Sequence, residues 1–379
     1  MKIAYCLSQF NVTGGIERIV SIKANWLVAH GYDVTFIIRD QEGLPVVYAL
    51  DERVKTVDLN VPGEMTSRLQ WRSPMVKEYR KKLEEHLLAT HYDIVISTDY
   101  TCSVYFLPKI KDGSKKIIEY HGAIHFRQVA AKNLPLRTRL LKTVITYYSL
   151  FKACKFDRVV ALSTTDFNEW KRYTSKAVRI PNAVTIEPSA ISTCENKEVI
   201  AVGRIDRHKG FEYLLDAWAL VLQRHPDWHL SIYGEMRNSP KYQKELAEQV
   251  ERLHLPADTF KGNSKNIAEH YAESSIYVCS SETESFALVI VEAAVCGLPA
   301  VSFDCPTGPR DIIEDGKTGY LVPKVGDVQG MAKALCRLIE DDALRKQMGA
   351  AAREASKRFS LDNVMRQWEQ LFAEVLNEK

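Results

Sequence analysis

ETESFALVIVEAAVCGLPAV, residues 282–301, has the clearest structural pattern in this chain. An apolar segment at 275–279 precedes it, and a second apolar segment at 300–303 follows its Gly-Leu-Pro. This order predicts strand, turn, helix and strand, the repeating unit of a parallel nucleotide-binding sheet. Open sheets of this kind bind ligands at the carboxyl ends of their strands, so the turn that follows the first strand is a candidate site.

Two acidic residues of this stretch, Glu284 and Glu292, are eight positions apart. Glu284 falls in the turn, and Glu292 is predicted about two turns into the helix. The amides of Phe286, Ala287 and Leu288 would face the same edge of the sheet, and a helix N-terminus there can bind phosphate. The segment therefore offers donors for a diphosphate and carboxylates for hydroxyl groups. The alternative is an amphipathic helix with two solvated acids.

A second candidate site is GRIDRHKG, residues 203–210, which follows an apolar segment at 199–202. Its cations Arg204 and Lys209 are bracketed by glycines. Arg204 offers a planar fork and Lys209 a compact charge, so together they can close on a diphosphate and stabilise it as it leaves. An ordinary solvated basic loop is the alternative.

The first half of the chain has two similar signals. Gly14 and Gly15 follow the apolar segment 3–7, and paired glycines let backbone amides approach a ligand closely. The pattern is not GxGxxG, so it does not predict a dinucleotide site. His121 ends an apolar segment at 116–120, which places it at the ligand-binding edge. The alternatives are a plain tight turn and a structural histidine.

Together these motifs resemble glycosyltransferase family 4. Members of that family have two glutamates separated by seven residues and followed by small residues, as at 284–299 here. The resemblance extends to Gly-Arg…Lys-Gly at 203–210, to Gly-Gly-x-Glu-Arg at 14–18, and to His121. It implies an α/β protein of the GT-B fold, with two facing Rossmann-like domains, a cleft between them and a last helix that crosses back.

The resemblance also implies an activity. The chain would be a retaining hexosyltransferase that needs no cofactor, because the nucleotide-sugar is a co-substrate. Glu292 would hold the ribose and Glu284 the donor sugar, while His121 would lie near the reaction site. Gly234 and Asn263, at the ends of two further apolar segments, would frame the base. UDP is expected because the loop at 305–310 resembles that of N-acetylhexosamine transferases.

For the acceptor, the resemblance points to the first domain. His125 and Arg127 are the weaker candidates there, after His121, and the acceptor would be a saccharide, lipid-linked as in surface-polysaccharide biosynthesis. Metal-independent action is expected, because no cluster of acidic residues accompanies the cationic motif. Two rival functions share these signals: a sugar-nucleotide epimerase of the same fold, and a non-catalytic protein that binds sugar nucleotides.

Length and charge agree with two domains. A chain of 379 residues exceeds the usual size of one domain, and we expect a first domain at 1–185 and a second at 186–358. The resemblance implies that residues 359–379 form a helix that packs back on the first domain. Residues 1–180 carry 28 basic and 18 acidic residues, a net charge of +10, whereas residues 181–379 have a net charge of −7. This asymmetry indicates an anionic partner for the first domain.

The segment 127–155 mixes basic residues with aliphatic and aromatic ones, which is typical of a helix lying on an anionic membrane. A basic patch at 68–82 would strengthen the attraction; the alternative is a packed helix with a solvated basic face. Nucleic acid is a poorer partner, because no binding motif accompanies the charge. Eight cysteines without CxxC spacing predict reduced core residues. With no signal peptide or spanning segment evident, we expect a cytoplasmic protein, peripheral on the inner face of the cell membrane.

Overall fold

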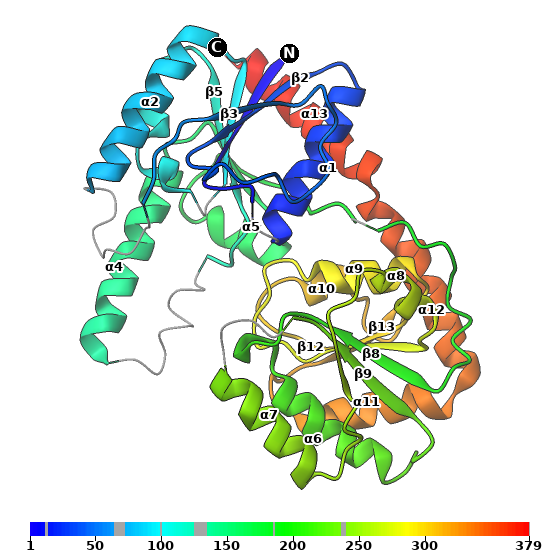
Figure 1. The fold of residues 1–379 in the computed structure, drawn as a ribbon. Helices are drawn as coiled ribbons and strands as arrows, with labels where there is room; N and C mark the ends of the chain where they lie inside the picture. Colours follow the sequence, from blue (N-terminus) through cyan, green and yellow to red (C-terminus); the bar gives the residue numbers. More distant parts are fainter. Residues whose placement is uncertain are drawn as a thin grey trace. The chain divides into compact units, whose positions relative to one another are not determined.

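The structure, a computed structural model, describes residues 1–11, 14–63, 73–98, 101–124, 135–184, 186–235 and 240–378. The chain forms two compact units (Figure 1). The first unit comprises Met1–Thr185 and Leu361–Lys379, and the second comprises Ile186–Ser360. The predicted class of two Rossmann-like parallel sheets with a long C-terminal helix is confirmed.

The first unit is built on a seven-stranded sheet in the order β3-β2-β1-β4-β5-β6-β7, in which every neighbouring pair is parallel. Its strands are β1 (Lys2–Leu7), β2 (Asp33–Ile38), β3 (Lys55–Asp58), β4 (Ile94–Thr98), β5 (Lys115–Tyr120), β6 (Arg158–Ala161) and β7 (Ala177–Arg179). Its helices are α1 (Gly15–Ala29), α2 (Pro74–Thr90), α4 (Leu136–Ala153), α5 (Thr164–Trp170) and α13 (Leu361–Asn377), with short turns η2 (Cys102–Tyr105) and η3 (Leu107–Lys109). The strand order reverses between β1 and β4.

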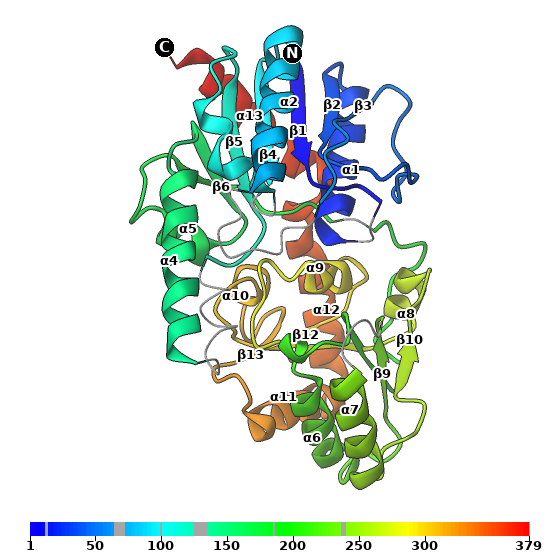
Figure 2. The ribbon, with the colours of Figure 1, turned by 60° about the vertical axis from the view of Figure 1, so that its left-hand side comes forward.

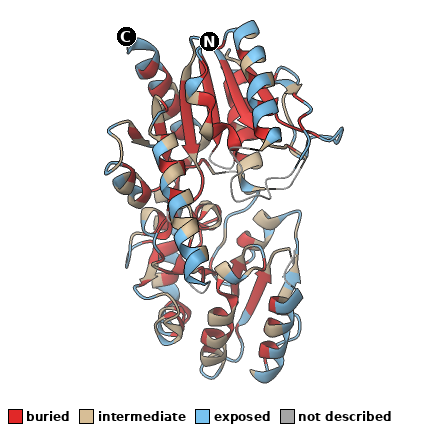
Figure 3. Ribbon diagram, turned by 90° about the vertical axis from the view of Figure 1, so that its left-hand side faces the viewer, coloured by how far each residue is buried: buried red, intermediate tan, exposed pale blue. Residues whose placement is uncertain are grey.

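The central strands β1, β2 and β4 are mostly buried because both faces of the sheet are covered, and Figure 3 shows most of this sheet in red. The edge strand β3 is exposed or half-buried. Tyr5 of β1 belongs to a core that α1 and α13 complete, whereas the next residue, Cys6, faces a second core beneath α2. The last helix, α13, contributes Trp368 and Phe372 to the first of these cores. Helix α13 therefore packs on the first unit.

The second unit has a six-stranded parallel sheet in the order β10-β9-β8-β11-β12-β13. Its strands are β8 (Glu198–Val202), β9 (His229–Tyr233), β10 (Phe260–Gly262), β11 (Ile276–Cys279), β12 (Ala300–Phe303) and β13 (Gly319–Val322). Its helices are α6 (Phe211–Leu222), α7 (Pro240–Arg252), α8 (Ile267–Ala272), α9 (Leu288–Val295), α10 (Pro309–Ile312), α11 (Val328–Glu340) and α12 (Asp342–Ser356), with turns η4 (Arg207–Lys209) and η5 (Lys357–Phe359). Here the strand order reverses between β8 and β11, which creates a crevice for ligands at their carboxyl ends.

Candidate functional site

The two motifs of the second unit meet at the point where its strand order reverses. The loop at 203–210 follows β8, and the loop at 280–287 follows the neighbouring strand β11. The loops are joined directly, because the Ser280 hydroxyl donates to the carbonyl of Lys209 at 2.8 Å and the amide of Glu282 donates to the carbonyl of His208 at 2.9 Å. Two loops about 75 positions apart in the sequence therefore form one hydrogen-bonded pair of loops.

An ion pair lies at the centre of these two loops. The Nζ of Lys209 donates to Oε1 of Glu284 at 2.6 Å, and the Ser281 hydroxyl donates to the same oxygen at 2.6 Å. Burial acts to lower the pKa of Lys209, but the nearby Glu284, Cys279 and Asp206, led by the Glu284 carboxylate, together raise that pKa overall. Lys209 is therefore held as a cation, with a fixed direction, at the carboxyl end of β8.

Arg204 is arranged differently from Lys209. Its side chain is 76% exposed and its guanidinium lies 3.8 Å from the Asp206 carboxylate, a contact that is too long to fix its position. The structure thus brings Lys209 and Glu284 together and leaves Arg204 extended toward solvent. The sequence motif did not reveal that Lys209 and Glu284 pair with each other.

Glycines let these loops approach closely. A Cβ on Gly234, after β9, would lie 1.8 Å from the carbonyl oxygen of Gly203. Gly210 has a φ of +60°, and a Cβ there would lie 2.3 Å from the carbonyl oxygen of Ser280. The close approach of Gly203 therefore requires a glycine at position 234, whether or not Gly234 makes the predicted contact with a base. Asn263 is exposed directly after β10, at the same edge of the sheet.

The turn before α9 is held in an unusual backbone conformation. Ala287 caps α9 with φ 67° and ψ 53°, in the left-handed region that residues other than glycine rarely adopt. The helix consequently begins at Leu288, so Glu292 lies just over one turn into it, and the expectation of two turns is wrong. Glu292 is buried, 3% exposed, on the body of this helix.

The loop after β12 supports this turn. The hydroxyl of Thr307 donates to the carbonyl of Glu284, and Gly308, with φ +95°, would place a Cβ only 2.7 Å from the backbone of Phe286. The ring of Phe286 packs edge-on against Phe359 at 5.5 Å between centroids. The loop at 305–310 therefore fixes where Glu284 and the first amides of α9 lie.

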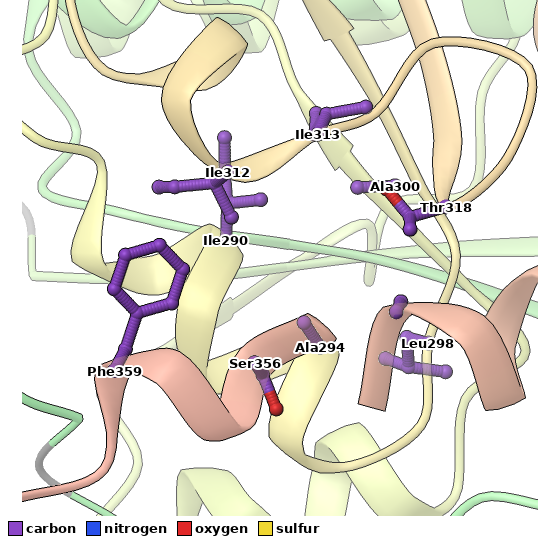
Figure 4. A pocket seen from close by; sticks show the side chains of 10 residues that line it. Ile290, Ala294, Leu298, Ala300, Ile312, Ile313, Thr318, Ser356 and Phe359 are labelled. Carbon is purple, nitrogen blue, oxygen red and sulfur yellow. The ribbon is translucent and has the colours of Figure 1, made fainter. Parts of the chain in front are cut away.

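Behind α9 is a small cavity, shown in Figure 4. Its lining is almost entirely aliphatic and aromatic, with hydroxyls only from Thr318 and Ser356: Ile290, Ala294, Leu298, Ala300, Ile312, Ile313, Thr318, Ala352, Ser356 and Phe359. A nucleotide needs several polar partners, so this cavity is a gap in the packing between α9 and α12.

In the first unit, Gly14 caps α1 and Glu17 folds back over it. A Cβ on Gly14 would lie 2.1 Å from Oε2 of Glu17, so the glycine makes room for this carboxylate. Burial raises the pKa of Glu17, while the charge of His121 acts in the opposite direction. Glu17 and His121 are therefore electrostatic neighbours, although they are far apart in the sequence.

His121 follows β5, as predicted, and is 6% exposed. Its Nε2 lies 3.5 Å from Oε1 of Glu119, and both oxygens of Glu119 accept from the Nζ of Lys23 at 2.5 Å. Burial alone would raise the pKa of Glu119, but the charge of Lys23, followed by that of His121, lowers it to about 2. On its other side, the Lys23 ammonium lies 4.1 Å from the ring centroid of Trp368 in α13.

Sequence reasoning did not single out Lys23 and Glu119, although the sequence held a signal. Each is a charged residue inside an apolar pattern: Lys23 on the buried face of α1, and Glu119 in a strand whose other central residues are buried. Charged residues are almost never fully buried unless they are paired. The predicted acceptor-side residues His125 and Arg127 lie outside the described residues, as does part of the basic patch at 68–82.

Within the described ranges, one group of side chains has its ligand atoms close enough to hold a metal: His225, Cys336 and Glu340. His225 follows the C-terminal end of α6, so the group lies at the opposite edge of the sheet from Lys209. The guanidinium of Arg224 already donates to Glu340 at 2.6 Å. This group is therefore separate from the candidate site.

Comparisons with known proteins agree with this arrangement. Residues 187–355 match the family model described as glycosyl transferases group 1, and residues 13–188 match the model of glycosyltransferase family 4. The amylovoran biosynthesis glycosyltransferase AmsD of Erwinia amylovora is 33% identical over 97% of this chain and 98% of its own length.

Two solved structures share the fold over nearly their whole length. Sucrose-phosphate synthase of Thermosynechococcus elongatus has a TM-score of 0.81 at 20% identity, with complete coverage of both chains. The Anabaena protein HepE, solved in complex with UDP-glucose, has a TM-score of 0.74 at 21% identity and covers 99% of this chain and 100% of its own.

Proposed function

The chain belongs to glycosyltransferase family 4, and on that premise we propose that it transfers a hexose or N-acetylhexosamine from a UDP-sugar to a saccharide acceptor with retention of configuration. The observation that carries this proposal is the Lys209–Glu284 ion pair at the point where the strand order reverses. The UDP-glucose complex of HepE, a protein of the same fold, supports UDP as the nucleotide.

In this proposal the diphosphate of the donor faces Lys209, Arg204 and the first amides of α9. The bond between the sugar C1 and the phosphate oxygen breaks, and the diphosphate gains negative charge. A cation fixed beside it stabilises that charge more in the transition state than in the ground state. Lys209 has three donors and gives one to Glu284, so it can bind phosphate without breaking the pair.

The acids have separate roles. Glu284 accepts hydrogen bonds from hydroxyls of the donor sugar, and Glu292 accepts them from the ribose. The acceptor oxygen forms the new bond to C1 on the face that the phosphate leaves, and its proton passes to the departing phosphate oxygen. Charge is then balanced without a side-chain nucleophile.

We propose that the reaction needs no divalent metal, because Lys209 and the helix amides supply the positive charge that a metal would otherwise supply. Turnover should persist in excess chelator. Loss of turnover in EDTA, with recovery on adding manganese, would contradict this part of the proposal.

The decisive test is turnover of a panel of labelled UDP-sugars with saccharide and lipid-linked acceptors. Lys209→Ala should lower kcat by on the order of 10²–10³, the loss typical of one preorganised donor to a developing charge. Arg207→Ala is a matched control, because Arg207 lies in the same turn but is engaged with Glu245. Full turnover by folded Lys209→Ala would show that the pair has no catalytic role. Donor consumption without acceptor would favour the epimerase, and binding without turnover the non-catalytic protein.

The acceptor side of the proposal concerns helix α4, which lies along the outside of the first unit (Figure 2). Its exposed apolar side chains recur every three or four positions and therefore form one stripe: Leu136 (66% exposed), Leu140 (59%), Val144 (63%), Tyr147 (49%) and Phe151 (56%). No residue of 136–145 is buried against the rest of the described chain.

Basic residues accompany this stripe, including Arg137, Arg139, Lys142 and Lys152. An amphipathic helix with an unpaired apolar face and flanking cations has the features of an interfacial membrane helix. We therefore propose that α4 binds an anionic membrane surface, where a lipid-linked acceptor would be available. None of the helices in the described ranges has the length and apolar composition to cross a bilayer.

A further inference from the structure

A buried arginine stands at the carboxyl edge of the first unit's sheet. Arg39 directly follows β2, its amide donates to the carbonyl of Leu7 at 2.9 Å, and its carbonyl accepts from the amide of Val61 at 2.9 Å. It is therefore level with the ends of β1 and β3, and it is 6% exposed. This is the edge at which open α/β sheets bind ligands.

The guanidinium of Arg39 uses few of its donors. It has five N–H groups, and among the described residues its side chain makes one hydrogen bond, in which Nη1 donates to the carbonyl of Val61 at 2.5 Å. The adjacent carboxylates have other partners, since Asp40 accepts from the amide of Glu42 at 3.3 Å and Asp58 from the amide of Gln41 at 3.2 Å.

Within the described ranges, no carboxylate lies within ion-pair distance of Arg39. Among the described groups, its charge acts on a phenol, Tyr79, and a thiol, Cys102. Burial raises the pKa of Cys102 to about 11 and that of Tyr79 well above its usual value, and the charge of Arg39 only opposes these shifts. Both groups are thus neutral near pH 7 and do not balance the charge. A buried cation without a counter-charge is strongly disfavoured, so proteins rarely retain one without a reason.

We propose that Arg39 binds an oxyanion, a phosphate or carboxylate group, carried by the acceptor. The planar fork of a guanidinium fits either group with two parallel hydrogen bonds. The net charge of +10 in residues 1–180 would also attract such a ligand. This proposal rests on the proposed function and adds that the acceptor carries a negatively charged group.

The test is calorimetric titration of the full chain, first saturated with UDP so that the second unit's diphosphate site is filled. Inorganic phosphate and glucuronate serve as separate probes, and the one that binds more tightly identifies the chemistry of the acceptor group. Arg39→Met should weaken binding of that probe by about tenfold or more, in line with the loss of a charge-assisted pair. Arg53→Met is the matched control, because Arg53 is an exposed arginine of the same unit paired with Asp51.

Thermal unfolding without ligand gives a second readout. If Arg39 is retained for a ligand, Arg39→Met should leave the unfolding midpoint of the free protein unchanged or raise it, because an uncompensated charge is removed. A lower midpoint together with unchanged affinity for both probes would overturn the proposal and assign Arg39 to the fold. Should Arg39→Met fail to fold, Arg39→Lys tests the same point, since it keeps the charge but loses the fork and should bind the probe more weakly than the wild type.

Failure of the proposed function would look different. Titrating UDP into Lys209→Ala tests the second unit, and unchanged UDP affinity there would contradict the proposed donor site. The tighter-binding of the two probes, titrated into the same Lys209→Ala protein, reports on the first unit, and weaker binding of that probe to Lys209→Ala/Arg39→Met supports the Arg39 proposal on its own. Equal affinity for that probe in these two proteins would overturn it.

Discussion

Lys23 of α1 and Glu119 of β5 form a buried ion pair, and breaking this pair should have a large effect on the stability of the protein. Lys23 and Glu119 are 1% exposed each. Lys23→Met leaves the carboxylate of Glu119 buried without its cation and should lower the free energy of unfolding by about 3–5 kcal/mol. Denaturant unfolding at pH 7 measures this loss in the free energy of unfolding. The matched control is Lys55→Met, which breaks an exposed pair with Asp33 and should change stability by no more than about 1 kcal/mol.

The same pair predicts a pH dependence. The pKa of Glu119 is about 2 in the folded protein, below the value of about 4.3 for an unfolded glutamate. A lowered folded pKa stabilises the protein above the unfolded value, and this contribution is lost as pH falls from about 4 toward 2. The double variant Lys23→Met/Glu119→Leu should therefore lose less stability than the wild type over that range. A parallel loss in both proteins would mean that other groups dominate acid unfolding.

Glu284 and Glu292 should differ in what their loss affects. Glu284→Gln removes a carboxylate next to Lys209 and should reduce turnover while leaving UDP affinity nearly intact. Glu292→Gln keeps the shape of a buried side chain and should weaken UDP binding. Calorimetry with UDP and turnover assays separate the two effects, and the reverse pattern would exchange the proposed roles.

At the scale of elements, the apolar stripe of α4 should determine membrane binding. Wild-type protein should float with vesicles containing acidic lipid and not with neutral vesicles, and salt should weaken the binding, because each basic residue near such a surface contributes about 1 kcal/mol. Leu140→Ser/Val144→Ser should abolish flotation. Leu88→Ser, at an exposed position of α2, is the control and should bind normally. Equal binding to both vesicle types, or no binding at low salt, would contradict the proposal and favour the alternative of a packed helix with a solvated basic face.

Elements were more predictable than the contacts between them. The strands predicted at 275–279 and 300–303 correspond to β11 (Ile276–Cys279) and β12 (Ala300–Phe303), because apolar runs bounded by turns carry a local signal. The start of α9 was predicted too early, because the left-handed conformation of Ala287 depends on support from Thr307 and Gly308.

The position of His121 at a strand end also followed from local pattern. The partners of His121 did not, since Lys23 and Glu119 are 96 positions apart and only tertiary packing joins them. The pairing of Lys209 with Glu284 could not be predicted for the same reason. The roles of the site residues in binding and catalysis remain predictions.

For the whole molecule, two units with separate cores predict separable responses to mutation. Trp368 of α13 is 1% exposed in a core of the first unit, and Trp218 of α6 is 0% exposed in the core of the second. Each change to alanine should cost about 3–5 kcal/mol, but in its own unit. Calorimetry should show Trp368→Ala lowering one transition and Trp218→Ala the other. A single transition that both variants lower equally would mean that the units unfold as one.

The place of α13 has a consequence for how the protein is made. A ribosome delivers residues 1–185 first, but the core of that unit includes Trp368 and Phe372 from the end of the chain. At about 5–20 residues per second, synthesis of the intervening 186–360 takes roughly 9 to 35 seconds. Through that interval the nascent first unit exposes the apolar surface that α13 will cover. Of the two units, the one that is translated first is therefore completed last, and chaperones have longer to bind it.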